Sequence, residues 1–231
     1  MMKALNPVIV KKAGSNDYDS MNRYMVSGCK FSSLLIMFFA IPCMIEMPYV
    51  LGLWLKDVPE WTALFCILQL VQTIIVQMAG SAATAVYAQG QIKWYAIWKS
   101  LMNIAPVILT YIAFKNGGGP LWLYLPMIVV WGIGGDAVII AFAHKMCGLP
   151  IGDYMRGCVL PLAAIAACML LFGFIPSMLM EESFIRLLLC ALLTSIAMIV
   201  SLWTIGIDAG EREALKEPIE KLILRYKQKY E

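Results

Sequence analysis

The sequence predicts an all-α fold: a polytopic transmembrane bundle of six membrane-spanning helices, followed by a C-terminal amphipathic helix. With 61% hydrophobic and only 14% charged residues, the chain has too little polar surface to cover a soluble globule of its size. Its apolar stretches are continuous rather than alternating, which favours helices over barrel strands. Each of the six is about as long as the ~20 residues that cross ~30 Å of hydrocarbon. They run approximately over Phe31–Trp54, Trp61–Val86, Trp94–Phe114, Leu121–Ala143, Gly157–Ser177 and Phe184–Ile205.

The chain divides into three parts. Residues 1–30 form a cytoplasmic lead-in segment, with a polar turn expected over Gly14–Asp17. Residues 31–207 hold the six-helix bundle, with short turns at Lys56–Glu60 and Asn116–Pro120. Residues 208–231 place apolar side chains at helical spacing among Lys and Glu, which predicts an amphipathic helix on the inner membrane surface or against the bundle. A partner-binding role for this tail is the less favoured alternative.

The positive charges predict the orientation of the bundle. If six spans alternate across the membrane, 15 of the 18 Lys and Arg residues fall on the side that holds both termini. Because positive residues are retained in the cytoplasm, both termini are predicted to be cytoplasmic, as expected for a multi-pass protein of the bacterial inner membrane. The opposite side keeps only Lys56, Lys115 and Arg186.

Several classes of site are not indicated by the sequence. The seven cysteines are scattered singly through apolar sequence, so they suggest neither a disulfide framework nor a metal site. We find no nucleotide-binding loop and no Ser/His/Asp set, so no enzyme activity, cofactor or nucleic-acid partner is expected. The expected partner of the apolar helix surfaces is the lipid bilayer.

Ionisable residues inside the spans are the main functional candidates, because they are costly in hydrocarbon. Glu46 is predicted either to line a watery cavity as an ion-coupling carboxylate or to lie near the outer interface. Asp136, within the glycine-rich stretch Trp131–Asp136, fits proton coupling and a packed ion pair equally well. Lys30, Lys99 and Arg186 are expected to extend from span ends toward the headgroups.

The second span carries a polar face. On an uninterrupted helix of 100° per residue, Gln69, Thr73 and Gln77 share one arc with Gly80, Ser81 and Thr84, and Gln72 lies beside it. This face suits sugar hydroxyls along a substrate path, and it suits hydrogen bonds between packed helices about as well. In the third span, Asn103 and Pro106 suggest a local break.

Four short segments together resemble a known family. They are Asn6–Lys11 with Asp17 shortly after, Lys30 leading into a span with Pro42, Leu53–Glu60 (LWLKDVPE), and Ala88–Tyr95 (AQGQIKWY). This order is similar to bacterial polysaccharide-biosynthesis proteins, the O-antigen and capsule oligosaccharide flippases of the multidrug/oligosaccharidyl-lipid/polysaccharide exporter superfamily. Gln89 stands where threonine is more usual.

The resemblance implies translocation of a polyprenyl-diphosphate-linked oligosaccharide across the inner membrane. It also implies two six-helix lobes, of which this chain corresponds to the C-terminal one, so a missing N-terminal lobe or a separate half is the expected partner. The diphosphate site is then expected on that other lobe. The alternatives are a drug or metabolite exporter of the same superfamily, and a non-transporting scaffold of a glycan assembly complex. A membrane-embedded glycan-processing enzyme would need clustered His, Asp or Arg at one membrane face, which the sequence lacks.

Overall fold

The computed structural model describes residues 2–207, with side chains from residue 5 onward, and this part of the chain is a helical bundle without strands. Six helices in it are long and apolar enough to cross a membrane, which confirms the predicted fold class. The amphipathic helix predicted over 208–231 lies outside the described residues. The elements are α1 (Met2–Gly14), α2 (Tyr18–Ile45), α3 (Met47–Gly52), α4 (Thr62–Gln77), α5 (Gly80–Ala88), α6 (Lys93–Lys115), η1 (Pro120–Leu123), η2 (Met127–Gly134), α7 (Gly135–Cys147), α8 (Ile151–Tyr154), η3 (Met155–Val159), α9 (Leu160–Leu179), α10 (Phe184–Ser201) and η4 (Leu202–Gly206).

The N-terminal segment is part of the bundle rather than a separate lead-in. The turn expected at Gly14–Asp17 is present, with Asn16 at a φ of 55°. α2 then begins at Tyr18 and continues through the boundary expected at residue 30, with Asp17 as its N-cap. α1 packs against α2 and α5, and its Ile9 is fully buried.

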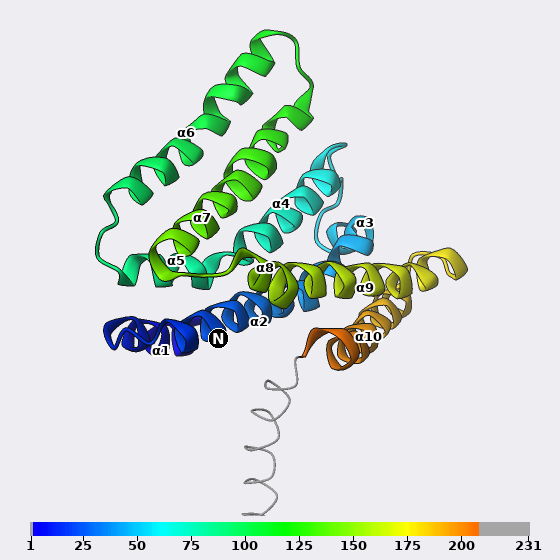
Figure 1. Ribbon diagram of the computed structural model, residues 1–231. Coiled ribbons are helices and arrows are strands. Elements are labelled where there is room, and N and C mark those ends of the chain that lie inside the picture. The colour runs from blue at the N-terminus through cyan, green and yellow to red at the C-terminus, as the bar shows by residue number, and fades with distance from the viewer. Residues whose placement is uncertain (1, 208–231) are drawn as a thin grey trace, which may run out of the picture.

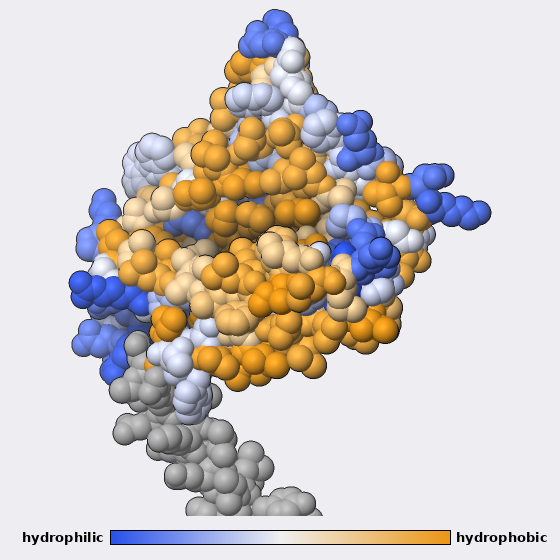
Figure 2. All heavy atoms as spheres, turned by 90° about the vertical axis from the view of Figure 1, so that its right-hand side faces the viewer, coloured by the Kyte–Doolittle hydropathy of each residue, from blue (hydrophilic) through white to orange (hydrophobic). Residues whose placement is uncertain are grey.

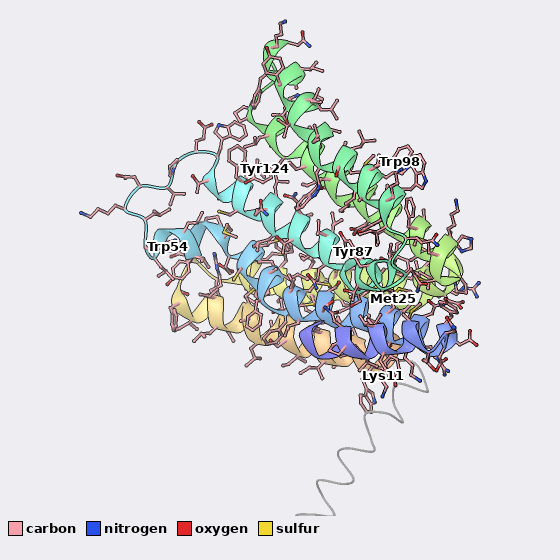
Figure 3. The ribbon with its side chains drawn as sticks, turned by 90° about the vertical axis from the view of Figure 1, so that its left-hand side faces the viewer. Lys11, Met25, Trp54, Tyr87, Trp98 and Tyr124 are labelled. Carbon is pink, nitrogen blue, oxygen red and sulfur yellow. The ribbon has the colours of Figure 1, made fainter. Side chains whose placement is uncertain are left out.

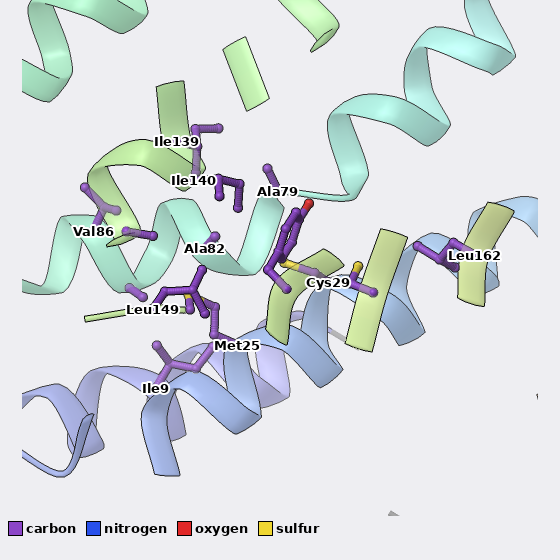
Figure 4. Close-up of a cluster of buried hydrophobic side chains, with 14 of the residues drawn as sticks. Ile9, Met25, Cys29, Ala79, Ala82, Val86, Ile139, Ile140, Leu149 and Leu162 are labelled. Carbon is purple, nitrogen blue, oxygen red and sulfur yellow. The ribbon is translucent and has the colours of Figure 1, made fainter. Parts of the chain in front are cut away.

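The six spans form two groups that diverge from a common base (Figure 1). In one group α9 and α10 pack against each other and against α2; in the other, α4, α6 and α7 pack together through η2. The base is formed by α1, α5 and the first half of α2. There, α5 packs against both α2 and α7, and the buried core includes Met25, Ala82 and Ile140 (Figure 4).

The end of the bundle where the start of α2 lies beside Gln89 and Cys147 is called the basic end, and the loops at 53–61, 116–119 and 180–183 form the opposite end. Large apolar side chains dominate the surface between them. Hydrophobic residues cover most of the face in Figure 2, with hydrophilic ones toward its margins. Figure 3 shows Trp98 of α6 pointing away from the bundle, and it is 48% exposed. Such a surface fits surrounding acyl chains.

Four spans change their helical geometry part-way, and in the fifth and sixth the change is a π-helical segment, η3 and η4. The second is interrupted after Gln77: the Met78 amide donates to Ile75 O at 2.9 Å, three residues back, and α5 starts again at Gly80. The fourth is π-helical from Met127 to Gly134 and becomes α-helical at Gly135. Figure 1 shows α4 and α5 running in different directions. The third span is continuous through Pro106, so the local break predicted there is wrong as regards secondary structure.

Candidate functional site

The interruptions of the second and fourth spans lie at the same depth. Gly132 of η2 lies against Ile75 of α4, where an added Cβ would come within 3.3 Å of the Ile75 side chain. Both spans run toward the basic end, so one helical turn further along each brings Asp136 level with Ala79. Asp136 lies 11 residues before Cys147, just past the middle of the fourth span. The Tyr154 hydroxyl, three residues into the fifth span, donates to Met78 O, so the interruption of the second span lies near the start of the fifth.

Asp136 is a buried carboxylate without a direct ion pair among the described residues. Its exposed fraction is 9%, and its Oδ1 has no hydrogen-bond partner. The Lys99 ammonium on α6 is near enough to interact with it electrostatically, but no N–O distance of 4 Å or less joins the two groups within the described part of the chain. Gly135 makes this approach possible, since a Cβ there would lie 2.8 Å from Lys99 Nζ.

Two more unpartnered polar side chains flank the interrupted span. Gln72, in the last turns of α4, is 1% exposed, and neither its oxygen nor its nitrogen has a hydrogen-bond partner. Ser81, in the first turn of α5, is fully buried; its Oγ also has none, and it lies against Gly28 of α2. An unsatisfied buried polar group is costly, so each of these three side chains marks a place where a proton, an ion or water can bind. Asp136, Gln72 and Ser81 are called the buried polar residues below.

Glu46 lies at the opposite end of the bundle and is neutralised. It is the single residue between α2 and α3, and it is fully buried. Arg186 of α10 donates to Glu46 Oε2 from both Nε (3.0 Å) and Nη2 (2.6 Å), while its Nη1 donates to Met180 O at 3.1 Å. The expectation that Arg186 reaches toward the headgroups is therefore wrong. A carboxylate of such low exposure needs a compensating charge, and packing of α10 against α2 supplies one.

Lys30 is also buried rather than extended to the headgroups. Its exposed fraction is 1%, and its Nζ donates to Gly206 O at 2.7 Å, at the end of the last span. A cation at the carbonyl end of a helix is stabilised by the helix dipole. Lys30 and Arg186 thus fasten α2 to the sixth span near both ends. Lys99, with its ammonium against Gly135, does not follow the predicted path to the headgroups either.

The residues predicted to form one polar face on the second span are separated by the interruption. Gln69 and Thr73 are exposed on α4, and the Thr73 hydroxyl donates back to Gln69 O at 2.8 Å. Gln77 is partly buried at the end of α4. Ser81, beyond the interruption, lies against α2 instead. The prediction of one continuous face over 69–84 is wrong, because it assumed an uninterrupted helix.

A shallow hollow of about 260 Å³ separates α6 from η1 and η2. Asn103 and Thr110 are the polar residues at its wall, and the Thr110 hydroxyl donates to Trp122 O at 3.1 Å. The remainder of its lining is apolar and comes from Pro106, Val107, Leu123, Met127 and Trp131.

Sequence reasoning missed the partners of the acidic residues. Arg186 follows the Ser183 cap of α10 by one turn, and nothing in the local pattern points to a residue 140 positions away. Lys99 could have been found, since Lys99 and Asp136 are the charged residues in the interior of the third and fourth spans. Among the described residues, no group of three His, Cys, Asp or Glu could hold a metal ion.

Comparison with known proteins adds no family: no protein-family model, curated protein or solved structure matches this chain.

Proposed function

We propose that this chain is part of a membrane transporter that moves a lipid-linked oligosaccharide between the leaflets of a bacterial inner membrane. The observation that carries the transport part is Asp136, a buried carboxylate inside the fourth span that forms no direct ion pair among the described residues and lies at the level of an interrupted span. Intramembrane carboxylates and interrupted helices are typical of ion-coupled carriers. The oligosaccharide part rests on the LWLKDVPE and AQGQIKWY segments, which resemble the polysaccharide branch of the exporter superfamily.

Asp136 is the stronger of the two coupling candidates. Glu46 already accepts two hydrogen bonds from Arg186, so a cation or proton arriving there would have to displace a buried guanidinium. Each carboxylate keeps one buried oxygen without a hydrogen-bond partner, Glu46 Oε1 and Asp136 Oδ1, so the difference lies in the ion pair: the lysine near Asp136 forms none with it. In the proposed cycle Asp136 binds and releases the coupling proton or cation, and Lys99 favours release by its positive charge.

The exposed amide of Gln69 supports a polar path on α4. A glutamine facing acyl chains would leave its hydrogen-bonding groups unsatisfied, so this part of α4 is proposed to face the glycan path or a second helical lobe. Thr73 and Gln77 follow on the same side of α4 at four-residue spacing. The partner proposed from the resemblance, a second set of membrane helices, would close the path on this side.

The proposed orientation places the basic end in the cytoplasm, as the charge distribution indicates. Fusing alkaline phosphatase or a fluorescent protein to the C-terminus tests it. A cytoplasmic C-terminus gives fluorescence and no phosphatase activity, whereas phosphatase activity would reverse the orientation.

Asp136→Asn tests the function, with Asp153→Asn as the matched control, because Asp153 is exposed on α8 and is not one of the buried polar residues. Cells that depend on the chain should lose surface polysaccharide and accumulate its lipid-linked precursor with the Asp136 variant, and should be normal with the control. If surface polysaccharide is normal and drug susceptibility rises instead, the chain belongs to the exporter alternative. If both variants behave as wild type while removal of residues 208–231 abolishes polysaccharide, the scaffold alternative holds.

A further inference from the structure

In the α4–α6–α7 group, the regular α-helical hydrogen bonding of all three spans is disturbed at about the same distance along the bundle. This position is called the weak level below. The second span is interrupted over Met78–Gly80, and the fourth changes from π to α geometry at Gly134–Gly135. On α6, Met102 lies beside Gly134, where an added Cβ would come within 3.4 Å of its Sδ. Met102 is also the residue whose carbonyl loses its helical donor, because Pro106 has no N–H four residues later. Prolines and π-helical segments are the usual causes of helix bending.

Beyond this level the three outer segments hold together as one unit. They are α4, η2 and the part of α6 that follows Pro106. Phe65 of α4 packs on Tyr124, next to η2, with ring centroids 5.2 Å apart. Gly132 contacts Ile75, and the Thr110 hydroxyl donates to Trp122 O. This set is called the outer unit below.

The facing group also contains π-helical segments, η3 in the fifth span and η4 in the sixth, but it is braced at both ends. Glu46–Arg186 and Lys30–Gly206 tie α2 to the last span. Gly173 lets α9 approach α10 closely, since a Cβ there would lie 2.6 Å from Thr194 Cγ2. No comparable packing joins α9 or α10 to α4, α6 or α7. The outer unit is joined to the rest through its own three spans and through the packing of α4 on α3 and on α2, the latter as extensive as that of α9 on α2, so this packing has to shift when the outer unit moves.

One hydrogen bond crosses from the braced group to the weak level. Tyr154 of α8 donates from its hydroxyl to Met78 O at 3.1 Å, and its side chain is buried. In a continuous helix this carbonyl would accept from the amide of Ala82, four residues on. Close packing fixes α8 and η3 to α2, since a Cβ on Gly157 would lie 2.9 Å from Val26. Tyr154 therefore holds the interruption from outside the outer unit.

We propose that the level defined by Met78–Gly80, Gly134–Gly135 and Pro106 is a hinge about which the outer unit moves relative to the α2–α9–α10 group, and that Tyr154 is the positioning residue that latches it. Motion at this level changes the surroundings of Asp136, which lies one residue beyond Gly135. The inference concerns the motion of this chain and is independent of which solute is moved.

Pulsed electron–electron spin resonance on the full chain in lipid nanodiscs tests the hinge. A genetically encoded spin label avoids the seven cysteines. Tyr111 on α6 and Leu171 on α9 are exposed positions in the two parts, and Leu171 with Ile199 on α10 forms the control pair within the braced group. The distance distribution between 111 and 171 should be broader than that between 171 and 199. Equal widths in the wild-type chain would overturn the hinge.

Tyr154→Phe tests the latch, because it removes the hydroxyl and keeps the ring. Loss of one hydrogen bond of ordinary net strength should raise the minor population of the 111–171 distance by roughly 3- to 10-fold. The 171–199 distance should not change. Tyr124→Phe, which removes a hydroxyl within the outer unit, should alter neither distance. An unchanged 111–171 distribution in Tyr154→Phe would refute the latch, and equal broadening of both pairs would show a general loss of packing instead. The wild-type comparison decides the hinge even if Tyr154→Phe does not insert.

Discussion

Arg186 and Glu46, 140 residues apart in the chain, form a buried ion pair in which two guanidinium nitrogens donate to the same carboxylate oxygen. The pair joins the start of α10 to the point where α2 gives way to α3. An acidic residue inside a span can either form a structural ion pair or bind a coupling ion, and this pair favours the structural role for Glu46. Glu46 joins two helices, and in the proposed function Asp136 is therefore the candidate for the coupling carboxylate.

Removing one partner of this pair should destabilise the bundle strongly. Arg186→Ala leaves Glu46 as an uncompensated charge in a buried position, and the expected loss is about 3–5 kcal/mol. Replacing both residues by methionine should cost much less, because no charge is stranded. Unfolding measured in bicelles by steric trapping checks both variants. Equal losses in the single and double variants would contradict a mutually compensating pair.

Gly173 should tolerate no side chain. An alanine Cβ at this position would collide with Thr194 of α10 and with Ile45 of α2, so Gly173→Ala should destabilise the α9–α10–α2 contact by about 1–3 kcal/mol. Gly52→Ala is the matched control, because a Cβ there meets nothing within 4 Å. Thermal denaturation of both variants in the same detergent distinguishes packing from a general effect of alanine.

Gln72 is predicted to contribute to transport and not to the stability of the folded chain. Both polar atoms of its buried amide lack partners, so Gln72→Leu should leave stability unchanged or raise it by about 1 kcal/mol. The same substitution should reduce transport if the buried polar residues bind water or an ion. A large loss of stability would mean that the amide is satisfied by a bound group in the folded protein.

The turn before α2 should respond to acid. Hydrogen bonds from Lys12 and from Ser20 lower the pKa of the Asp17 carboxyl below its ordinary value of 3.8. A lowered pKa in the folded state means that the contribution of Asp17 is present above pH 3.8 and is lost as the pH falls through the lowered value. Asp17→Asn should remove this dependence. Carboxyl chemical shifts of Asp17 followed by NMR check the direction, and a midpoint above 3.8 would refute it.

The fold was predictable because its signals are local. A span needs only an apolar stretch of sufficient length, and the turns at Gly14–Asp17 and Asn116–Pro120 are signalled by their own residues. The glycines of the stretch Trp131–Asp136 permit close helix approach, since Gly132, Gly134 and Gly135 each face a neighbouring helix.

The site was only partly predictable because its geometry depends on distant packing. Asp136 and Glu46 stood out as acids in apolar surroundings, but the Arg186 partner that separates their roles comes from the last span. No proline lies at the interruption after Gln77, so the sequence gives no local signal for it. The Tyr154 hydroxyl donates a hydrogen bond to Met78 at this interruption, and a contact between residues so far apart in the chain cannot be predicted from local hydrophobic periodicity.

The leaflet distribution of lipid-linked oligosaccharide in cells with and without this chain tests the proposed function most directly. Inner-membrane vesicles of known sidedness can be treated with a glycosidase that reaches only the exposed leaflet. If the chain takes part in translocation, its removal should confine the precursor to the cytoplasmic leaflet, and restoring the wild-type chain, but not Asp136→Asn, should return it to both. An unchanged distribution without the chain would contradict the account.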